Sequence, residues 1–281
     1  MLAFINDLGQ FPFLRMALLA TVLASIACGI VGSYVTVRRS TYIAGAIAHC
    51  TLGGMGLARY LQVEMGMAWA TPLAGAILAA LLAGLLISFL QNRPNMRLDT
   101  VLSAIWATGM AIGILFISRT SGYNEDLMSY LFGDILMVTR TDLMLIAGLD
   151  LVLVAAALFF QRELDAIAFD EEFARLSGLP VRLYDTLFLL VVALTVVLLV
   201  QLVGIILVVA LLALPAAAAA RITTRLPTMI LAAILLCLLA GTGGLAISYP
   251  LDLPAGAMII LVAGAIYLVT ACIRDRTAGQ S

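Results

Sequence analysis

Residues 182–220 read RLYDTLFLLVVALTVVLLVQLVGIILVVALLALPAAAAA, an apolar run whose main interruptions are Gln201 and Gly204. A bilayer core of about 30 Å takes about 20 helical residues per crossing, so this run has roughly twice the length that one crossing needs. It predicts either two crossings joined by a minimal turn, or one long helix followed by a broken or re-entrant segment that ends at Pro215. Both interpretations place the run inside a membrane.

The composition of the whole chain agrees with a membrane location. Of its 281 residues, 64% are hydrophobic and 11% are charged, and the mean hydropathy is +1.15. Soluble domains carry about a quarter charged residues, so a water-soluble globular protein, a disordered chain and a disulfide-stapled secreted domain are excluded. The 15 basic and 16 acidic residues nearly cancel, and no basic surface for nucleic acid is indicated.

Further apolar runs bounded by charges flank this stretch. They predict about eight or nine membrane spans in all, at 13–37, 41–60, 69–91, 99–118, 141–161, 182–201, 203–220, 226–248 and 254–273. Few residues remain for the loops and both tails, which leaves no room for a soluble catalytic domain. We therefore expect an all-α protein, a polytopic transmembrane helical bundle that forms a single domain over residues 1–281.

The arginines indicate the orientation of these spans. With nine spans and the N-terminus outside, eleven arginines fall on the inner side and four on the outer side. The inner set is Arg38, Arg39, Arg93, Arg97, Arg162, Arg175, Arg182, Arg221, Arg225, Arg274 and Arg276, and the outer set is Arg15, Arg59, Arg119 and Arg140. Because cytoplasmic loops carry an excess of basic residues, this bias favours an N-terminus outside the cytoplasm.

The segment at about 165–179 is the one charged stretch of any length, and its pattern predicts a short amphipathic helix on the inner side. Its apolar side carries Phe169, Phe173 and Leu176, and its polar side carries Asp170, Glu171, Glu172 and Arg175. Gly178 and Pro180 then stop the helix. Two interpretations stay open: a solvated loop that folds locally, or a docking helix with Phe anchors and a charged rim for a cytoplasmic partner.

The string FDEEFARLSGLPVRLYDTLFLL (169–190) resembles the coupling segment of permeases in the zinc/manganese/iron-chelate metal-uptake family of ABC transporters. An Asp, a downstream Ala and a Gly recur at this spacing in that family, and the matching positions here are Asp170, Ala174 and Gly178. Other stretches resemble the same family in the same order. They are TYIAGAIAHCTLGGMGLA (41–58), LDTVLSAIWATGMAIGILFIS (98–118), DLMSYLFGDILMVTRTDL (126–143), VGIILVVALLALPAAAAARIT (203–223) and SYPLDLPAGAMIIL (248–261).

The resemblance implies the permease subunit of an ATP-driven ABC importer for a divalent transition metal (zinc, manganese or iron) or its chelate. It implies a multi-pass protein of the bacterial inner membrane, with no catalytic site and no bound cofactor of its own. The implied partners are two copies of a cytoplasmic ABC ATPase, a second permease copy or similar chain, an extracytoplasmic metal-binding protein and membrane lipid, but no nucleic acid. The residues to which it assigns ATPase coupling are Phe169, Asp170, Glu171, Glu172, Phe173, Ala174 and Gly178.

His49 is the single histidine of the chain and lies inside the second span. Small residues share its helical face, namely Gly45, Ala46, Gly53 and Gly56, and such a stripe either allows close helix packing or lines a cavity. A lone histidine in a span is more often a hydrogen-bonded packing residue than a ligand. Imidazole is nevertheless a good ligand for transition metals, so His49 is the candidate metal ligand.

The family pattern places an Asp four residues before the matching histidine, whereas this sequence has Gly45 there. His49 alone cannot hold a divalent ion. Another helix could supply a ligand, the pathway could bind the ion weakly and let it pass, or the substrate could be a chelate or something else. Asp150 in the fifth span and Asp252 between the last two spans are candidate additional ligands. Manganese favours oxygen ligands, so the absence of a carboxylate at position 45 makes zinc a better-suited substrate than manganese.

Two other functional classes stay open from the sequence. A secondary transporter of the inverted-repeat kind would need no ATPase, but the halves show no convincing repeat and no intramembrane charge pair for a coupling ion. A membrane enzyme with a His-based site ranks third, because the sequence has neither a second histidine nor an H-E-x-x-H motif. It also has no G-x-x-x-x-G-K-[ST] loop, so the chain does not bind ATP through a P-loop.

Overall fold

The computed structural model describes residues 11–91, 96–121 and 135–278, together with residues 7 and 133. This part of the chain forms helices and no strands, which confirms the all-α prediction. Its long helices are α2 (Pro12–Val37), α3 (Thr41–Glu64), α4 (Pro72–Gln91), α5 (Leu98–Arg119), α7 (Arg140–Phe159), α10 (Val181–Val203), α11 (Ile205–Ile222), α12 (Leu226–Leu251) and α13 (Ala255–Ala278). The short elements are η1 (Ile135–Met137), α8 (Gln161–Phe169) and α9 (Glu171–Leu176).

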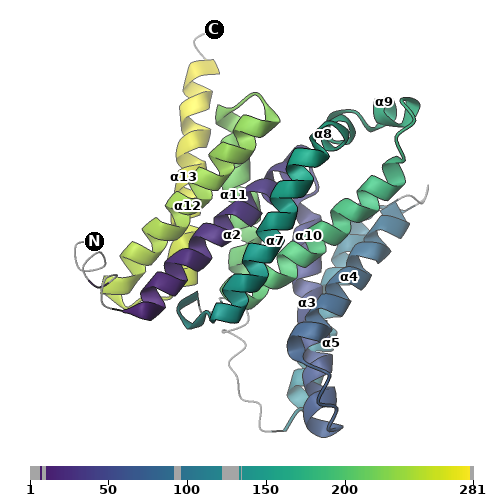
Figure 1. The fold of residues 1–281 in the computed structure, drawn as a ribbon, viewed down its shortest axis with the longest axis vertical. Coiled ribbons are helices and arrows are strands. Elements are labelled where there is room, and N and C mark those ends of the chain that lie inside the picture. Colours follow the sequence, from purple (N-terminus) through teal and green to yellow (C-terminus); the bar gives the residue numbers. More distant parts are fainter. Residues whose placement is uncertain (1–6, 8–10, 92–95, 122–132, 134, 279–281) are drawn as a thin grey trace.

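Successive long helices run in alternate directions through the bundle (Figure 1). Among the described residues, eight helices are long and apolar enough to cross a membrane, and the more polar α3 is the ninth long helix. This agrees with the predicted eight or nine spans. Figure 1 shows the last turns of α13, α8 and α9 at one end of the bundle and the start of α2 at the other. That the end with α8 and α9 faces the cytoplasm stays a prediction from the arginine bias.

The run at 182–220 forms two helices, so the first of its two interpretations is confirmed and the re-entrant one is wrong. Gly204 alone separates α10 from α11, with φ 79° and ψ 164°. A positive φ is accessible to glycine without steric cost, which allows the chain to turn at one residue. Pro215 lies inside α11 instead of ending it.

The long helices pack in two groups. In one group α3 contacts α4 and α5, and α4 contacts α10. In the other group α11 and α12 contact each other, and each of them contacts both α2 and α13. Helix α7 packs mainly on α2. The α3 to α5 group lies to one side of α2, α12 and α13 in Figure 1. His49 therefore belongs to the first group, whereas Asp150 on α7 and Asp252 at the end of α12 belong with the second.

Glycines bring α3 into close contact with its neighbours. A Cβ placed on Gly53 would lie 2.7 Å from the carbonyl oxygen of Gly109 on α5, and one on Gly56 would lie 2.7 Å from that of Gly113. Gly54 meets Gly75 of α4 in the same way. Because a side chain at these contacts would collide with backbone, the close-packing interpretation of Gly53 and Gly56 is confirmed.

We predict that Gly53→Ala lowers the thermal midpoint of the detergent-purified protein, with a loss of about 1–3 kcal/mol, because the new methyl group overpacks the α3–α5 contact. Gly148→Ala on α7 is the matched control, since a Cβ there meets no heavy atom within 4 Å. Alanine is the better helix former, so the control should be as stable as the unmodified protein or slightly more stable. Equal midpoints for the two variants would contradict the close contact.

Candidate functional site

The segment predicted as one helix over 165–179 consists of two short helices. Helix α8 ends at Phe169 and α9 begins at Glu171, with the extended backbone of Asp170 (φ −150°, ψ 91°) between them. The Asp170 carboxylate accepts a hydrogen bond of 2.9 Å from the backbone N–H of Phe173. Asp170 is thus an N-cap, and this cap starts a new helix where amphipathic periodicity alone predicts continuity.

The last residue of α8 and two residues of α9 present large apolar side chains away from the bundle. Phe169, Phe173 and Leu176 are 67%, 63% and 82% exposed. Ala174 is completely buried and packs with Ile167 and Val181 in a small separate cluster. One side of α9 is therefore fixed to α8 and to the start of α10, while its apolar anchors point outward as a docking helix requires.

The remaining assigned positions frame these anchors. Glu172 is exposed beside Phe173, and Glu171 belongs to α9, although its side chain lies outside the described residues. Gly178 has a φ of 83°, and a Cβ there would meet nothing within 4 Å. The left-handed glycine ends the segment as the sequence predicts. The coupling role of all seven positions stays a prediction.

Helix α8, unlike α9, is anchored to the bundle. Asp165 lines a cavity of about 260 Å³ together with Tyr34 of α2 and Ile230 of α12. Burial raises the pKa of the Asp165 carboxyl, because a low-dielectric environment disfavours its charged form. Helix α9 is therefore attached to the bundle through α8 on one side and through the start of α10 on the other.

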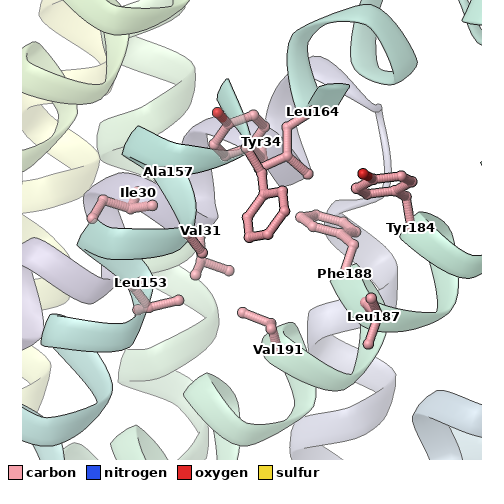
Figure 2. A pocket seen from close by; sticks show the side chains of 12 residues that line it. Ile30, Val31, Tyr34, Leu153, Ala157, Leu164, Tyr184, Leu187, Phe188 and Val191 are labelled. Carbon is pink, nitrogen blue, oxygen red and sulfur yellow. The ribbon is translucent and has the colours of Figure 1, made fainter. Parts of the chain in front are cut away.

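An apolar cavity of about 240 Å³ lies between α2, α7, α8 and α10, near the end of the bundle that carries α9. Figure 2 shows the rings of Tyr34, Tyr184 and Phe188 around it, with Leu164 of α8 at its rim. The Tyr34 and Phe188 rings meet edge to face with centroids 6.5 Å apart. No sequence pattern indicates the cavity, because its lining comes from four separate helices.

An ion pair connects α2 to α10 beside this cavity. The Arg38 guanidinium at the end of α2 donates to the Asp185 carboxylate in the first turns of α10. Their side chains are 19% and 7% exposed. The Arg38 guanidinium also lies over the Phe188 ring, 4.8 Å from its centroid. The sequence shows both charges at span ends, but it does not show that they pair.

His49 lies on α3 at the contact with α5. Its imidazole stacks on the indole of Trp106, with ring centroids 4.2 Å apart and planes inclined by 13°. The Nδ1 atom is buried and has no hydrogen-bond partner among the described residues. Buried polar atoms usually have a hydrogen-bond partner, so packing against Trp106 leaves this nitrogen unsatisfied within the described residues.

The two candidate additional ligands lie apart from His49 in the fold. Asp150 is buried on α7, close to Cys28 of α2, and its carboxylate oxygens have no hydrogen-bond partner in the described part of the chain. Asp252 is exposed at the turn between α12 and α13, with φ 50°. Within the described residues, no three or more His, Cys, Asp or Glu side chains form a group that could hold a metal. A ligand role for all three residues stays a prediction.

Comparison with known proteins gives consistent matches over almost the whole chain. The ABC 3 transport family matches residues 10–274. An uncharacterised membrane protein of Synechocystis is 40% identical over 265 residues, which cover 94% of this chain and 92% of that protein. The manganese transport system membrane protein MntC of Halalkalibacterium halodurans is 31% identical, over 94% of this chain and 88% of the relative.

A solved structure shows the same fold. PsaBC from Streptococcus pneumoniae, determined in complex with Fab, matches 96% of this chain and 95% of its own, with a TM-score of 0.84 and 31% sequence identity. Sequence and structure therefore agree over the same helices, and the family resemblance seen in the sequence is confirmed. The chain is a multi-pass membrane protein that belongs to the ABC 3 transport family.

Proposed function

We propose that this chain is the membrane-spanning permease subunit of an ATP-driven ABC importer for a divalent transition metal or its chelate. The observation that carries the proposal is the family match over residues 10–274. The relative named as a manganese transport membrane protein supports metal as the cargo. The exposed anchors of α9 support a cytoplasmic partner.

The energy comes from other subunits in this proposal. The sequence has no P-loop motif, so a cytoplasmic ABC ATPase in two copies hydrolyses ATP. Two permease copies, or this chain and a similar one, pair around a central route, since one copy does not enclose a symmetric pathway. An extracytoplasmic metal-binding protein delivers the cargo to the opposite face, and the chain itself performs gating in place of catalysis.

In this proposal, movement passes from α9 to His49 through a series of helix contacts. Closure of the ATPase moves α9, and the buried Ala174 passes the movement to the start of α10. The Arg38–Asp185 ion pair then links α10 to α2. Helix α2 leads into α3 through a tight turn at Arg39, which has a φ of 52°. Movement of α2 therefore tilts the helix that carries His49, which alternately opens the pathway to each side.

At the cargo site, His49 supplies a neutral imidazole nitrogen to the passing ion. Asp150 and Asp252 lie apart from His49 in this chain, so groups of the second permease copy are the proposed sources of further ligands at His49. Zinc suits the imidazole of His49 better than manganese does, because manganese prefers oxygen ligands. An incomplete set in one chain also suits a conduit, which must release its cargo.

We predict that Phe173→Ala reduces co-purification of the ABC ATPase by about tenfold or more, because loss of an exposed anchor at an interface costs roughly 2 kcal/mol. Phe13→Ala is the matched control, since Phe13 is 40% exposed at the opposite end of the bundle. Mass spectrometry of the purified complex, with the ATPase recognised by its P-loop, measures the effect. Equal ATPase recovery with both variants would remove α9 from the interface.

We predict that Asp185→Asn lowers both the thermal midpoint and metal uptake, because it leaves Arg38 as a largely buried charge without its partner, at a cost of about 3–5 kcal/mol. ATPase co-purification should persist. The charge swap of Arg38→Asp with Asp185→Arg should recover much of both quantities. Asp99→Asn controls for loss of an exposed carboxylate. Full uptake by Asp185→Asn would exclude the pair from the route between α9 and His49.

We predict that His49→Ala abolishes or strongly reduces metal accumulation in cells at normal expression and assembly, because the pathway loses its imidazole ligand. Cys50→Ala is the matched control, since Cys50 is the next residue and is also partly buried, but projects about 100° away around the helix. Elemental analysis of washed cells measures accumulation. Unchanged accumulation with His49→Ala would show that His49 is a packing residue.

A further inference from the structure

Helix α11 contains a proline in its interior, Pro215. In an α-helix each backbone N–H donates to the carbonyl oxygen four residues before it, and proline has no N–H. Pro215 therefore removes the main-chain donor of the Leu211 carbonyl. Both residues are buried, and the bilayer interior offers no water as a substitute. Because an unpaired buried carbonyl costs free energy, this turn of α11 needs a donor from elsewhere.

The donor comes from a neighbouring helix. The Cys237 thiol of α12 donates to the Leu211 carbonyl oxygen, with a sulfur–oxygen distance of 3.4 Å. The Cys28 thiol of α2 in turn forms a hydrogen bond with the Cys237 thiol, and both cysteines are 1% exposed. A thiol is a weak donor in water, but a dry interior strengthens its hydrogen bonds. Three helices are thus joined at the turn that Pro215 interrupts.

Helix α2 also packs directly against this turn. A Cβ on Gly32 of α2 would lie 2.4 Å from the Leu212 carbonyl oxygen and 3.4 Å from the Cβ atom of Ala216. These two residues flank Pro215 on α11. Helix α2 contacts α12 as well. The interrupted turn is therefore held from two sides, by the backbone of α2 and by the thiol of α12.

We propose that Pro215 and Cys237 form a hinge that is held closed: the proline removes a backbone hydrogen bond from α11, and the thiol of α12 replaces it. The consequence for gating rests on the proposed function. In that function, movement of α10 reaches α11 through Gly204, and the closed hinge makes α11 move together with α2 and α12 instead of bending at Pro215. Cys237 is then a positioning residue for the gate and not a metal ligand.

The test is a double-substitution cycle of Cys237→Ala and Pro215→Ala in the complete permease–ATPase complex, measured by hydrogen–deuterium exchange of residues 212–219. Cys237→Ala alone should accelerate their exchange by about fivefold or more, because loss of a buried hydrogen bond lets the turn open more often. In the Pro215→Ala background the N–H of residue 215 again serves the Leu211 carbonyl. There Cys237→Ala should change the exchange by less than about twofold, since the volume lost with the thiol is the same in both backgrounds.

Cys50→Ala is the matched control. The Cys50 thiol lies 4.0 Å from the Ala79 carbonyl oxygen of α4, but this carbonyl keeps its main-chain donor because Ala83 has an N–H. The control should leave the exchange of residues 212–219 unchanged. Equal acceleration by Cys237→Ala with and without Pro215 would overturn the hinge.

Thermal midpoints provide a second measurement of the same cycle, in case exchange in this turn is too slow to follow. Cys237→Ala should lower the midpoint by about 2–4 °C more when Pro215 is present than when it is replaced. Strictly additive midpoints would overturn the hinge in the same way.

ATP-driven uptake of zinc or manganese by these complexes in vesicles separates the hinge from the proposed function. Cys237→Ala should lower uptake, because α11 then bends at Pro215, and the double variant should recover much of it. Accelerated exchange with unchanged uptake would overturn the role of the hinge in gating. If the unmodified complex takes up neither metal, the proposed function fails, whereas the exchange measurement still decides whether the thiol closes the turn.

Discussion

The close contact of α3 with α4 and α5 is the constraint on which the rest of the structure depends. Lipid chains are as apolar as the side chains of a span, so burial of apolar surface does not drive helices together in a bilayer, and close packing must do so. Glycines at Gly53 and Gly56 face glycines of α5, and backbone meets backbone. These contacts enclose the most polar long helix in protein and hold His49 against Trp106.

The two ends of the molecule are built with different interactions. At the α9 end, the Arg38–Asp185 pair and a ring of aromatic side chains around a cavity of about 240 Å³ connect α2, α7 and α10. Between α3 and α5, glycines bring the two backbones into direct contact. The end beside α9 contains a cavity, whereas α3, which carries the candidate ligand His49, is tightly packed. This difference suits a gate in which the end beside α9 moves and α3 tilts as a rigid helix.

Much of the fold follows from the sequence because span length is a physical requirement of the bilayer. The apolar runs predict the long helices closely, and Gly204 marks the turn inside the longest run. Hydrophobic periodicity predicts one helix over about 165–179 and does not show the break at Asp170. The Asp170 side chain caps α9 and so divides this segment into α8 and α9. The pairs Arg38–Asp185 and His49–Trp106 join different helices, and a single sequence contains no signal for such contacts. The separation of Asp150 and Asp252 from His49 has the same origin, since it depends on how the two helix groups pack.

We propose that this chain gates a metal pathway with energy from ATP hydrolysis by a partner ATPase. The most direct test is metal entry into vesicles that contain the purified permease–ATPase complex, with the metal-binding protein outside and nucleotide on the ATPase side. We predict that zinc or manganese enters with ATP and not with a non-hydrolysable analogue, and that vesicles with the permease alone accumulate neither. Entry at the same rate without the ATPase would contradict it and would indicate a secondary transporter.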